Sequence, residues 1–385
     1  MRKKICVFIG SRANYSSLIS IINYIKKSRK LKLQIMVGAS AILEKYGDIR
    51  ELLNKNGHKN YDEVNFLIEG TSLNSMAQSA GLGIIEISNC LKRLKPDAFL
   101  IVGDRFEMLS AAIAASYMNI YIIHTMGGEI SGSIDESIRH AITKLAHIHF
   151  PANEDAKNRI IKLGEDPKFI FNFGCPRLDT IKKSIVKNNN NYIQDILNKE
   201  GVGSKIDFKL PYILVLQHPV TTEFHNNILN INKTLKAISN IVIQKIILWP
   251  NSDAGSDQIS QQLRKFKENK YLENIRFFKN FDFEIFSKLL FKASCVVGNS
   301  SSGIRDCSFL GTPVVDIGTR QKNRKKFKNV ITVDNNSDHI YKAIIKQIKK
   351  RYPRSYIYGK GDSGLRIVKK LENIIFPSIQ KKFFD

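Results

Sequence analysis

The chain has 385 residues, of which 43% are hydrophobic, and its 60 lysines and arginines exceed its 35 aspartates and glutamates by 25. This length predicts two or three domains, and the hydrophobic share excludes intrinsic disorder as the main state. No apolar run approaches the roughly 20 residues that span a bilayer, so we expect no membrane-spanning segment. The basic balance leaves nucleic acid or an acidic membrane surface open as alternative partners.

The N-terminal segment and the cysteines indicate a cytoplasmic protein. The apolar stretch within residues 1–10 is too short for a signal peptide and lacks a small-residue cleavage site, so we expect a first β-strand there. The five cysteines are widely spaced and include no Cys-x-x-Cys pair. This pattern argues against disulfides or a zinc site and fits a reducing compartment.

Short β-branched runs alternate with longer amphipathic segments along almost the whole chain. Continuous apolar strands separated by helices predict parallel sheets covered on both faces, which is an α/β doubly wound architecture. In chain order, the expected strands are Ile5–Ile9, Leu33–Val37, Ala98–Val102, Tyr121–His124, His147–Phe150, Phe169–Phe173, Tyr212–Leu216, Lys245–Trp249, Ile275–Phe278, Cys295–Gly298, Pro313–Ile317 and Val330–Val333.

One polar, asparagine-rich stretch over 187–205 interrupts this alternation, and we expect a domain junction there. The pattern predicts two Rossmann-like domains facing each other across a cleft. The first covers 1–185 and the second covers 206–365. A C-terminal helix over 366–385 is expected to pack back towards the first domain. Ligands of such sheets lie beyond the carboxyl ends of the strands.

The first strand runs into a turn and helix that could bind an anion. Gly10 permits a tight turn, the helix N-terminus offers free N–H groups, and Arg12 supplies a fixed positive charge. Asn14, in the same turn, is a further candidate for phosphate binding. An ordinary strand-to-helix turn with a solvated arginine is the alternative. The chain has no Gly-x-Gly-x-x-Gly and no Walker motif, so a standard dinucleotide or NTP-hydrolysing loop is not expected.

Asp104 follows a very apolar strand and stands beside a glycine and an arginine. A carboxylate at this position can face a cleft, and its alternative role is to cap the following helix. The next strand leads into the densest group of candidate acids and bases, which could serve general acid–base chemistry. A capping turn and surface histidines are the structural alternative. The members of this group are His124, Glu129, Asp135, Glu136 and Arg139.

His147 and His149 alternate on an expected strand and therefore point to one face. A His-x-His pair can form half of a metal site, but no further ligand cluster at suitable spacing accompanies it. We therefore expect a hydrogen-bonded structural role for the pair and no metal.

The second half has its own candidate anion site. A run of small hydroxyl residues opens a helix after the strand Cys295–Gly298, and such a run can bind a diphosphate through backbone N–H groups and hydroxyls. A flexible turn is the alternative. The candidate binding residues in this half are His218, Asn251, Ser300, Ser301, Asp306 and Arg320.

Taken together, these blocks resemble the hydrolysing UDP-N-acetylglucosamine 2-epimerases. The likeness covers essentially the whole chain, and several blocks in register are more specific than any single one. The blocks that match in order are Gly10–Tyr15, Gly103–Arg105, Gly127–Glu129, Ile134–His140, Gln217–Pro219, Asn251–Gly255 and Asn299–Arg305.

The resemblance implies a two-domain fold like that of GT-B glycosyltransferases, with the nucleotide mainly on the C-terminal domain. It also implies a UDP-sugar substrate, no metal or other cofactor, and elimination of UDP to a glycal followed by addition of water. A homo-oligomer, either a dimer or a tetramer, is expected, without nucleic acid or membrane as a partner. By the resemblance, Asp104 and Asp135 match acid/base positions; Arg12, His218 and Arg320 match phosphate contacts; and Ser300, Ser301 and Asp306 match the nucleotide-binding run.

Three positions depart from the family pattern. Met126 stands where many relatives carry a catalytic glutamate, so Glu129 or Asp135 is expected to take over that duty. Ala39–Ala41 stands where relatives often carry a histidine, and Asp306 replaces a more usual glutamate. These departures leave two other functions open. One is the same reaction on a UDP-2,4-diacetamido-2,4,6-trideoxy sugar, and the other is a GT-B glycosyltransferase.

The excess charge lies mainly outside the acid/base block. Residues 97–144 hold six acidic and three basic residues, whereas residues 320–354 hold twelve basic and two acidic ones. Part of this charge can attract an anionic sugar nucleotide, and most of it is expected to be solvated surface.

Overall fold

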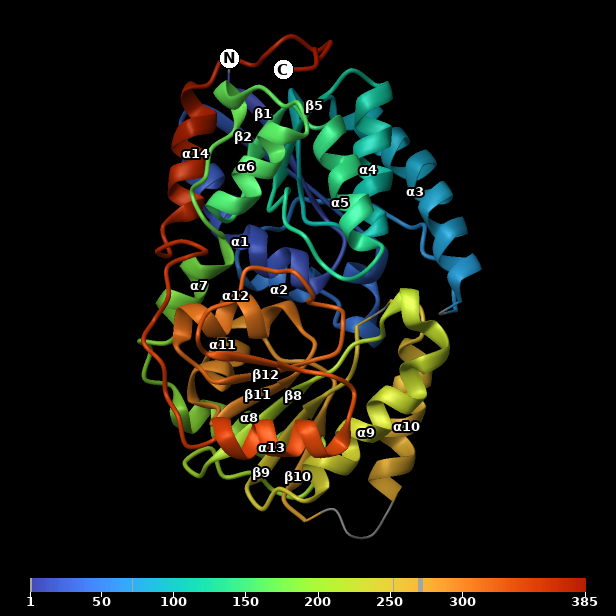
Figure 1. Ribbon diagram of the computed structural model, residues 1–385. Helices are drawn as coiled ribbons and strands as arrows, with labels where there is room; N and C mark the ends of the chain where they lie inside the picture. Colours follow the sequence, from blue (N-terminus) through green and yellow to red (C-terminus); the bar gives the residue numbers. More distant parts are fainter. Residues whose placement is uncertain (1, 71, 252, 269–272) are drawn as a thin grey trace. The chain divides into compact units, whose positions relative to one another are not determined.

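The computed structural model describes residues 2–70, 72–251, 253–268 and 273–385. The chain forms two compact units, shown in Figure 1. The first contains residues 1–130, 134–180 and 357–385, and the second contains 131–133 and 181–356. The helix α7 (Arg177–Ser184) contains the passage from the first unit to the second.

The first unit is built on a six-stranded, wholly parallel sheet in the order β3-β2-β1-β4-β5-β6. Its strands are β1 (Lys3–Ile9), β2 (Leu31–Gly38), β3 (Asp62–Val64), β4 (Ala98–Val102), β5 (Tyr121–Thr125) and β6 (Ile148–Phe150). Its helices are α1 (Arg12–Lys27), α2 (Arg50–Lys55), α3 (Leu73–Leu94), α4 (Phe106–Tyr117), α5 (Asp135–Leu145), α6 (Glu154–Lys162) and α14 (Ser363–Asn373).

Both faces of this sheet are covered, as the continuous apolar strands predict. In β1, Cys6 and Phe8 belong to a core with residues of α3, α4 and α5, because alternate side chains of a strand point to opposite faces. The helix α1 packs against β1, β2 and α14, and it lies with α14 away from α3 and α4 in Figure 1. The carboxyl ends of β1, β4 and β5 are therefore left for loops.

The second unit has a seven-stranded sheet in the order β13-β12-β11-β8-β9-β10-β7, in which only the β7–β10 pair is antiparallel among the described strands. Its strands are β7 (Val202–Gly203), β8 (Tyr212–Leu216), β9 (Gln244–Leu248), β10 (Ile275–Phe278), β11 (Cys295–Gly298), β12 (Val314–Ile317) and β13 (Val330–Val333). Its helices are α8 (Asn190–Lys199), α9 (Asn227–Ser239), α10 (Ser256–Glu268), α11 (Phe283–Lys292), α12 (Ser301–Leu310) and α13 (Ser337–Gln347).

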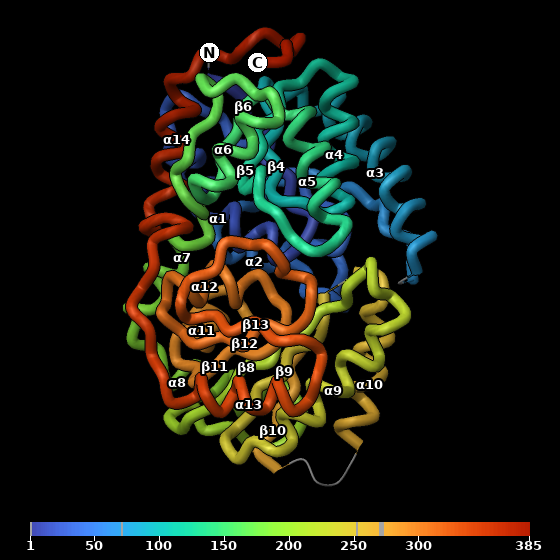
Figure 2. Tube along the Cα trace, in the orientation of Figure 1, coloured from blue at the N-terminus to red at the C-terminus, as the bar shows by residue number. Residues whose placement is uncertain are grey.

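The core of the second unit joins one face of the sheet to α9, α10 and α13, which contribute Ile231, Leu263 and Ile344 among others. The helix α9 contacts both α10 and α13, and the trace in Figure 2 shows α9 running beside α10. The prediction of two doubly wound, Rossmann-like domains is thus confirmed.

Three local expectations need correction. The expected strand Phe169–Phe173 is instead a 3₁₀ turn (Pro167–Phe169) and irregular chain, whose rings Phe171 and Phe173 stack near Phe150 at 5.9 Å between centroids. The polar stretch over 187–205, where a domain junction is expected, holds α8 and β7, and the chain passes from the first unit to the second before it, at 180–181. The last helix ends at Asn373, and residues 374–385 are not helical.

Candidate functional site

Asp104 stands at the carboxyl end of β4 and forms an ion pair with Arg139. Gly103, with a φ of +83°, turns the chain out of the strand in a conformation that suits glycine. The Asp104 Oδ2 atom then accepts hydrogen bonds from both the Nε, at 3.0 Å, and the Nη2 of Arg139. The following helix begins after Arg105, whose side chain makes no capping bond. Asp104 therefore holds a cation from α5.

Arg139 is the buried centre of this group. Its side chain is 1% exposed, and its Nη1 donates to the Glu129 carbonyl oxygen at 2.5 Å. Burial opposes the charge of the guanidinium, but the attraction of Asp104 and Glu129 outweighs burial and raises the pKa of Arg139. The cation therefore persists in the interior and keeps a negative partner beside it.

His124 lies at the end of β5, and its side chain is fully buried. Its Nε2 lies 2.8 Å from the Gly103 carbonyl oxygen, and its Nδ1 lies 3.3 Å from the Thr143 hydroxyl. Burial lowers the pKa of His124 to about 3, so the ring is neutral at physiological pH. A neutral, enclosed ring does not supply a proton from an imidazolium.

The two remaining acid/base candidates differ in exposure. Glu129 is 4% exposed, whereas Asp135 is half-buried as the first residue of α5. Asp135 and Glu136 both stand in the first turn of this helix, where negative charge favours the helix dipole. The N-cap residue of α5, Ile134, makes no side-chain capping bond.

Met126 is buried and adopts a left-handed backbone conformation, with a φ of +63°. Its sulfur lies 3.8 Å from the Cys175 sulfur. A thioether transfers no proton, so any acid or base in this region is one of the neighbouring carboxylates.

The His-x-His pair belongs to a different part of the first unit. His149 Nε2 lies 3.1 Å from the buried Glu165, which also binds the Lys144 and Lys381 ammonium groups at 2.7 and 2.6 Å. His147 Nε2 contacts the Ile379 carbonyl oxygen. Both histidines thus help to hold the C-terminal tail, and no group of three or more potential metal ligands occurs in the described part of the chain.

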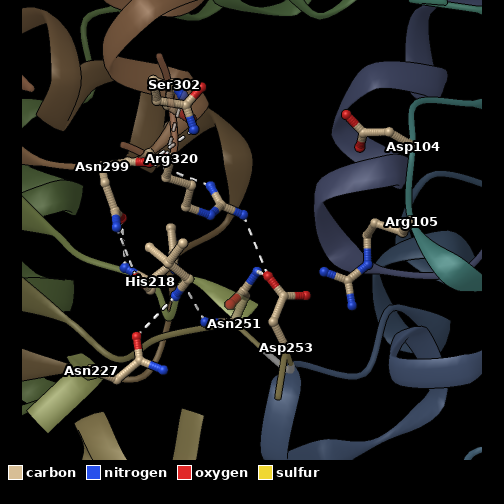
Figure 3. A network of polar contacts seen from close by, with 12 residues as sticks. Asp104, Arg105, His218, Asn227, Asn251, Asp253, Asn299, Ser302 and Arg320 are labelled. Carbon is tan, nitrogen blue, oxygen red and sulfur yellow. Dashed lines mark hydrogen bonds and ion pairs between the residues drawn. The ribbon is translucent and has the colours of Figure 1, made fainter. Parts of the chain in front are cut away.

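The turn after β1 packs against a buried acid of α4, Glu107, that sequence reasoning missed. A Cβ atom on Gly10 would lie 2.5 Å from Glu107 Cγ, so the glycine makes room for this side chain. Glu107 is fully buried and accepts from Arg105 Nε at 2.7 Å. A glutamate on an otherwise apolar helix face was the available signal. The side chains of Asp104 and Arg105 leave the chain on the same side in Figure 3.

The two phosphate candidates of this turn have different surroundings. Ser11 caps α1 by accepting from the Asn14 backbone N–H at 3.2 Å, and Asn14 is 7% exposed. Arg12 is half-buried as the first residue of the helix. Asn14 therefore stabilises the helix start, while Arg12 and the first-turn N–H groups have the chemistry suited to an anion.

In the second unit, His218 is held in a network of amide groups at the carboxyl ends of β8 and β11 (Figure 3). Its backbone N–H donates to Asn299 Oδ1 at 2.7 Å, and Asn299 Nδ2 returns a bond to the His218 carbonyl at 2.8 Å. The His218 Nδ1 accepts from the Asn251 backbone N–H at 3.2 Å, which places the ring proton on Nε2. Ser252, next to Asn251, lies outside the described residues.

Arg320 follows β12 and approaches the same network. Its Nη2 lies 3.4 Å from Asp253 Oδ2, and its Nη1 donates to the Asn299 carbonyl at 3.3 Å. Asp253 also accepts from Asn251 Nδ2 at 2.5 Å. The network therefore presents a guanidinium next to amide and backbone donors.

The serine run is the N-terminus of α12. Ser300 is its N-cap and accepts from the Ser302 N–H at 3.3 Å, and Ser301 is the first helical residue. Asp306, one turn further on, is 1% exposed. The run is thus a helix start with N–H donors suited to an anion.

The two units present side chains that suit different chemistry. The first unit presents carboxylates beside a buried cation, which suits proton transfer, and the second presents cationic and N–H groups, which suit phosphate. No helix in the described part of the chain is long and apolar enough to cross a membrane.

Comparison with known proteins gives a consistent answer. The family model described as UDP-N-acetylglucosamine 2-epimerase matches residues 23–372. The chain is 31% identical to "UDP-N-acetylglucosamine 2-epimerase" of Neisseria meningitidis serogroup B over 389 residues, covering 100% of this chain and 99% of the relative. It is also 31% identical to "UDP-N,N'-diacetylbacillosamine 2-epimerase (hydrolyzing)" of Legionella pneumophila, with 97% of each chain covered.

Solved structures agree at the level of the fold. A Neisseria meningitidis UDP-GlcNAc 2-epimerase bound to UDP-GlcNAc superposes with a TM-score of 0.78 at 18% identity, over 96% of this chain and 99% of that one. This likeness supports the GT-B-like fold class. By its full-length matches in sequence, the chain belongs to the UDP-N-acetylglucosamine 2-epimerase family.

Proposed function

We propose that the protein is a hydrolysing 2-epimerase that converts UDP-N-acetylglucosamine into UDP and N-acetylmannosamine. The observation that carries this proposal is Asp104, a carboxylate fixed on a buried arginine at the carboxyl end of a central strand. The family membership and the hydrolysing relatives of the same degree of identity support it.

The reaction is an elimination followed by an addition, so it needs a base and an acid near C1 and C2 of the sugar. A base removes the proton from sugar C2, the C1–O bond to UDP breaks, and a C1–C2 double bond forms. Water then adds its oxygen to C1, and C2 receives a proton on the opposite face. The pairing with Arg139 favours the carboxylate form of Asp104, which suits it as the base, and the half-buried Asp135 is the candidate acid. Glu129 and Arg139 support these two carboxylates.

UDP is the leaving group, and its departure needs positive charge and N–H donors at the diphosphate. We assign the phosphate contacts to His218, Arg320 and the N-terminus of α12 with Ser300 and Ser301, together with Arg12 of the first unit. Asn251 acts through the His218 ring. Asp306 is assigned to the nucleoside, where a carboxylate can accept from ribose hydroxyls.

A labelled-product assay tests this function. The protein is incubated with UDP-N-acetylglucosamine in heavy water, and the products are followed by NMR. We expect free UDP and N-acetylmannosamine that carries deuterium at C2, because C2 is reprotonated from solvent-derived protons. Asp104→Asn is the matched inactive control. UDP release without C2 deuterium would contradict the elimination, and a product that keeps its UDP would indicate a non-hydrolysing epimerase.

The second candidate substrate is a UDP-2,4-diacetamido-2,4,6-trideoxy sugar. Two relatives at 31% identity are named as hydrolysing 2-epimerases of the N,N'-diacetylbacillosamine nucleotide, and Met126 places an apolar side chain where many relatives carry a carboxylate. The same assay run with both sugar nucleotides at equal concentration decides between them through the ratio of kcat/KM values.

A further inference from the structure

The buried His124 ring occupies space that a neighbouring glycine leaves open. The ring is fully buried between the end of β5 and the helix α5. A Cβ atom on Gly127 would lie 2.7 Å from His124 Nδ1, closer than Cβ atoms approach other groups. A glycine at this position is therefore required for the ring to lie where it does.

The hydrogen bonds of the ring define its protonation. A carbonyl oxygen only accepts, so the 2.8 Å contact with Gly103 places the proton on Nε2. The Thr143 hydroxyl has one proton and faces two acceptors, the Arg139 carbonyl at 2.9 Å and His124 Nδ1 at 3.3 Å. The Nε2 bond to Gly103 is therefore the main directional contact of the ring.

Gly103 depends on hydrogen bonds to hold its position, because its neighbours do not crowd it. It is the residue immediately before Asp104, its φ of +83° is open to few other residues, and a Cβ there would meet no atom within 4 Å. Its N–H donates to the Thr125 carbonyl at 3.0 Å, and its carbonyl accepts from His124. Two consecutive residues of β5 therefore bind the N–H and the carbonyl of Gly103, the residue that leads into Asp104.

The hydrogen bonds and the ion pair around His124 connect back to the ring in a closed network. His124 binds the Gly103 carbonyl, the chain continues to Asp104, and Asp104 pairs with Arg139. Thr143, one turn along α5 from Arg139, returns to the ring. A shift of the imidazole would therefore move the Asp104 carboxylate relative to its cation.

We propose that His124 is a positioning residue, which donates from Nε2 to the Gly103 carbonyl and thereby sets the place of the Asp104 carboxylate on Arg139. This inference rests on the proposed function, which assigns Asp104 to proton transfer. It changes the role expected for His124 from acid/base chemistry to geometry. The low pKa of His124 agrees with it, because the neutral form is the one that accepts and donates in this network.

The first test needs no activity. In the intact protein, long-range ¹H–¹⁵N spectra distinguish the two neutral tautomers and the imidazolium of each histidine. We expect the Nε2–H tautomer of His124 at every pH from 5.5 to 8.5. A ring that titrates within this range, or that carries its proton on Nδ1, overturns the proposal.

The second test compares two substitutions. His124→Phe keeps a ring but has no donor, whereas the Nε2 of His124→Gln lies the same number of bonds from Cβ as the imidazole Nε2 and can still donate. We expect kcat to fall by about 10²-fold in the phenylalanine variant, on the scale of a misplaced reacting group, with KM changed by less than about threefold. The glutamine variant should recover kcat to within about tenfold of the wild type.

His58→Gln is the matched control, because His58 is also buried and is hydrogen-bonded through Nε2 to Asn23 at 3.1 Å, a contact that does not involve Asp104. Its kcat should equal that of the wild type. Equal losses in the two His124 variants, or a loss confined to KM, would contradict a positioning role. If the wild type turns over neither sugar nucleotide, the proposed function fails, while the tautomer measurement still decides the role of the ring.

Discussion

The polar network of the first unit is built on formal charges, whereas that of the second unit is built mainly on amides and backbone groups. In the first, Arg139 and Asp104 form an ion pair whose cation is 1% exposed. In the second, His218 is held by Asn299 and Asn251, and the Arg320–Asp253 pair is longer, at 3.4 Å. The difference shows two ways of holding reactive groups in place.

A buried ion pair is costly to break, because removal of one partner leaves the other charge without compensation in a medium of low dielectric constant. Amide groups carry no net charge, so the cationic and N–H groups that they surround can bind an incoming anion. We therefore expect substitutions in the first network to change turnover and folding, and substitutions in the second to change nucleotide affinity.

The largest effect is expected from Asp104→Asn, which removes the candidate base and keeps its shape. Turnover should fall by at least about 10²-fold with UDP affinity retained, the scale of general acid–base groups. Product formation followed by NMR measures it, and circular dichroism checks the fold. Asp97→Asn, at the other end of β4, is the control, since this exposed carboxylate accepts from the Lys4 N–H at the start of the sheet. Near-normal turnover of Asp104→Asn would remove this residue from the catalytic group.

Acid should weaken the first unit. Burial lowers the pKa of His124 to about 3 and also lowers the pKa of His58, His140, His147 and His149. The unfolded chain therefore binds more protons, so the stability is complete above about pH 6.5 and is lost as the pH falls towards 3. From pH 6.5 to 5, His124 alone should cost about 2 kcal/mol of unfolding free energy.

Urea unfolding at pH 7 and pH 5 measures this loss of unfolding free energy. The transition is monitored with a spectroscopic probe in the first unit. His124→Gln has no titratable group at position 124, so its loss on acidification should be smaller by the contribution of His124. Unfolding midpoints that are equal at the two pH values would show that these histidines are charged in the folded protein.

In the second network, His218→Ala should weaken UDP binding about tenfold, since a hydrogen bond to a charged group contributes about 1.5 kcal/mol. Titration calorimetry with UDP measures it. The matched control is His225→Ala, an exposed histidine of the same unit. An affinity for UDP that the His218 substitution leaves unchanged would exclude this ring from the phosphate site.

The smallest effect is expected from Ser300→Ala, which removes the N-cap of α12. The lost bond to the Ser302 N–H should lower the free energy of unfolding by about 1 kcal/mol. Chemical denaturation compares it with Ser301→Ala, which lies inside the helix and caps nothing. Equal stabilities of the two variants would mean that the helix start is held by other contacts.

Local patterns predicted most of the two sheets, because long apolar runs bounded by polar turns have few other ways to be buried. β4 and β8 have the bounds expected from their apolar runs alone. The short strands β3 and β7 were not predicted, since Asp62–Val64 and Val202–Gly203 carry no apolar pattern and become strands only by pairing with a neighbour.

The candidate site shows the same division. The sequence by itself determined which acids, bases and small residues end the strands, and its blocks indicated the family. Only the tertiary structure decided their roles: Arg139 binds Asp104 across 35 positions of chain, and the ring of His124 is closed off from solvent. The physical reason is that charge state and hydrogen-bond partners depend on burial and on neighbours from other elements, which spacing along the chain does not encode.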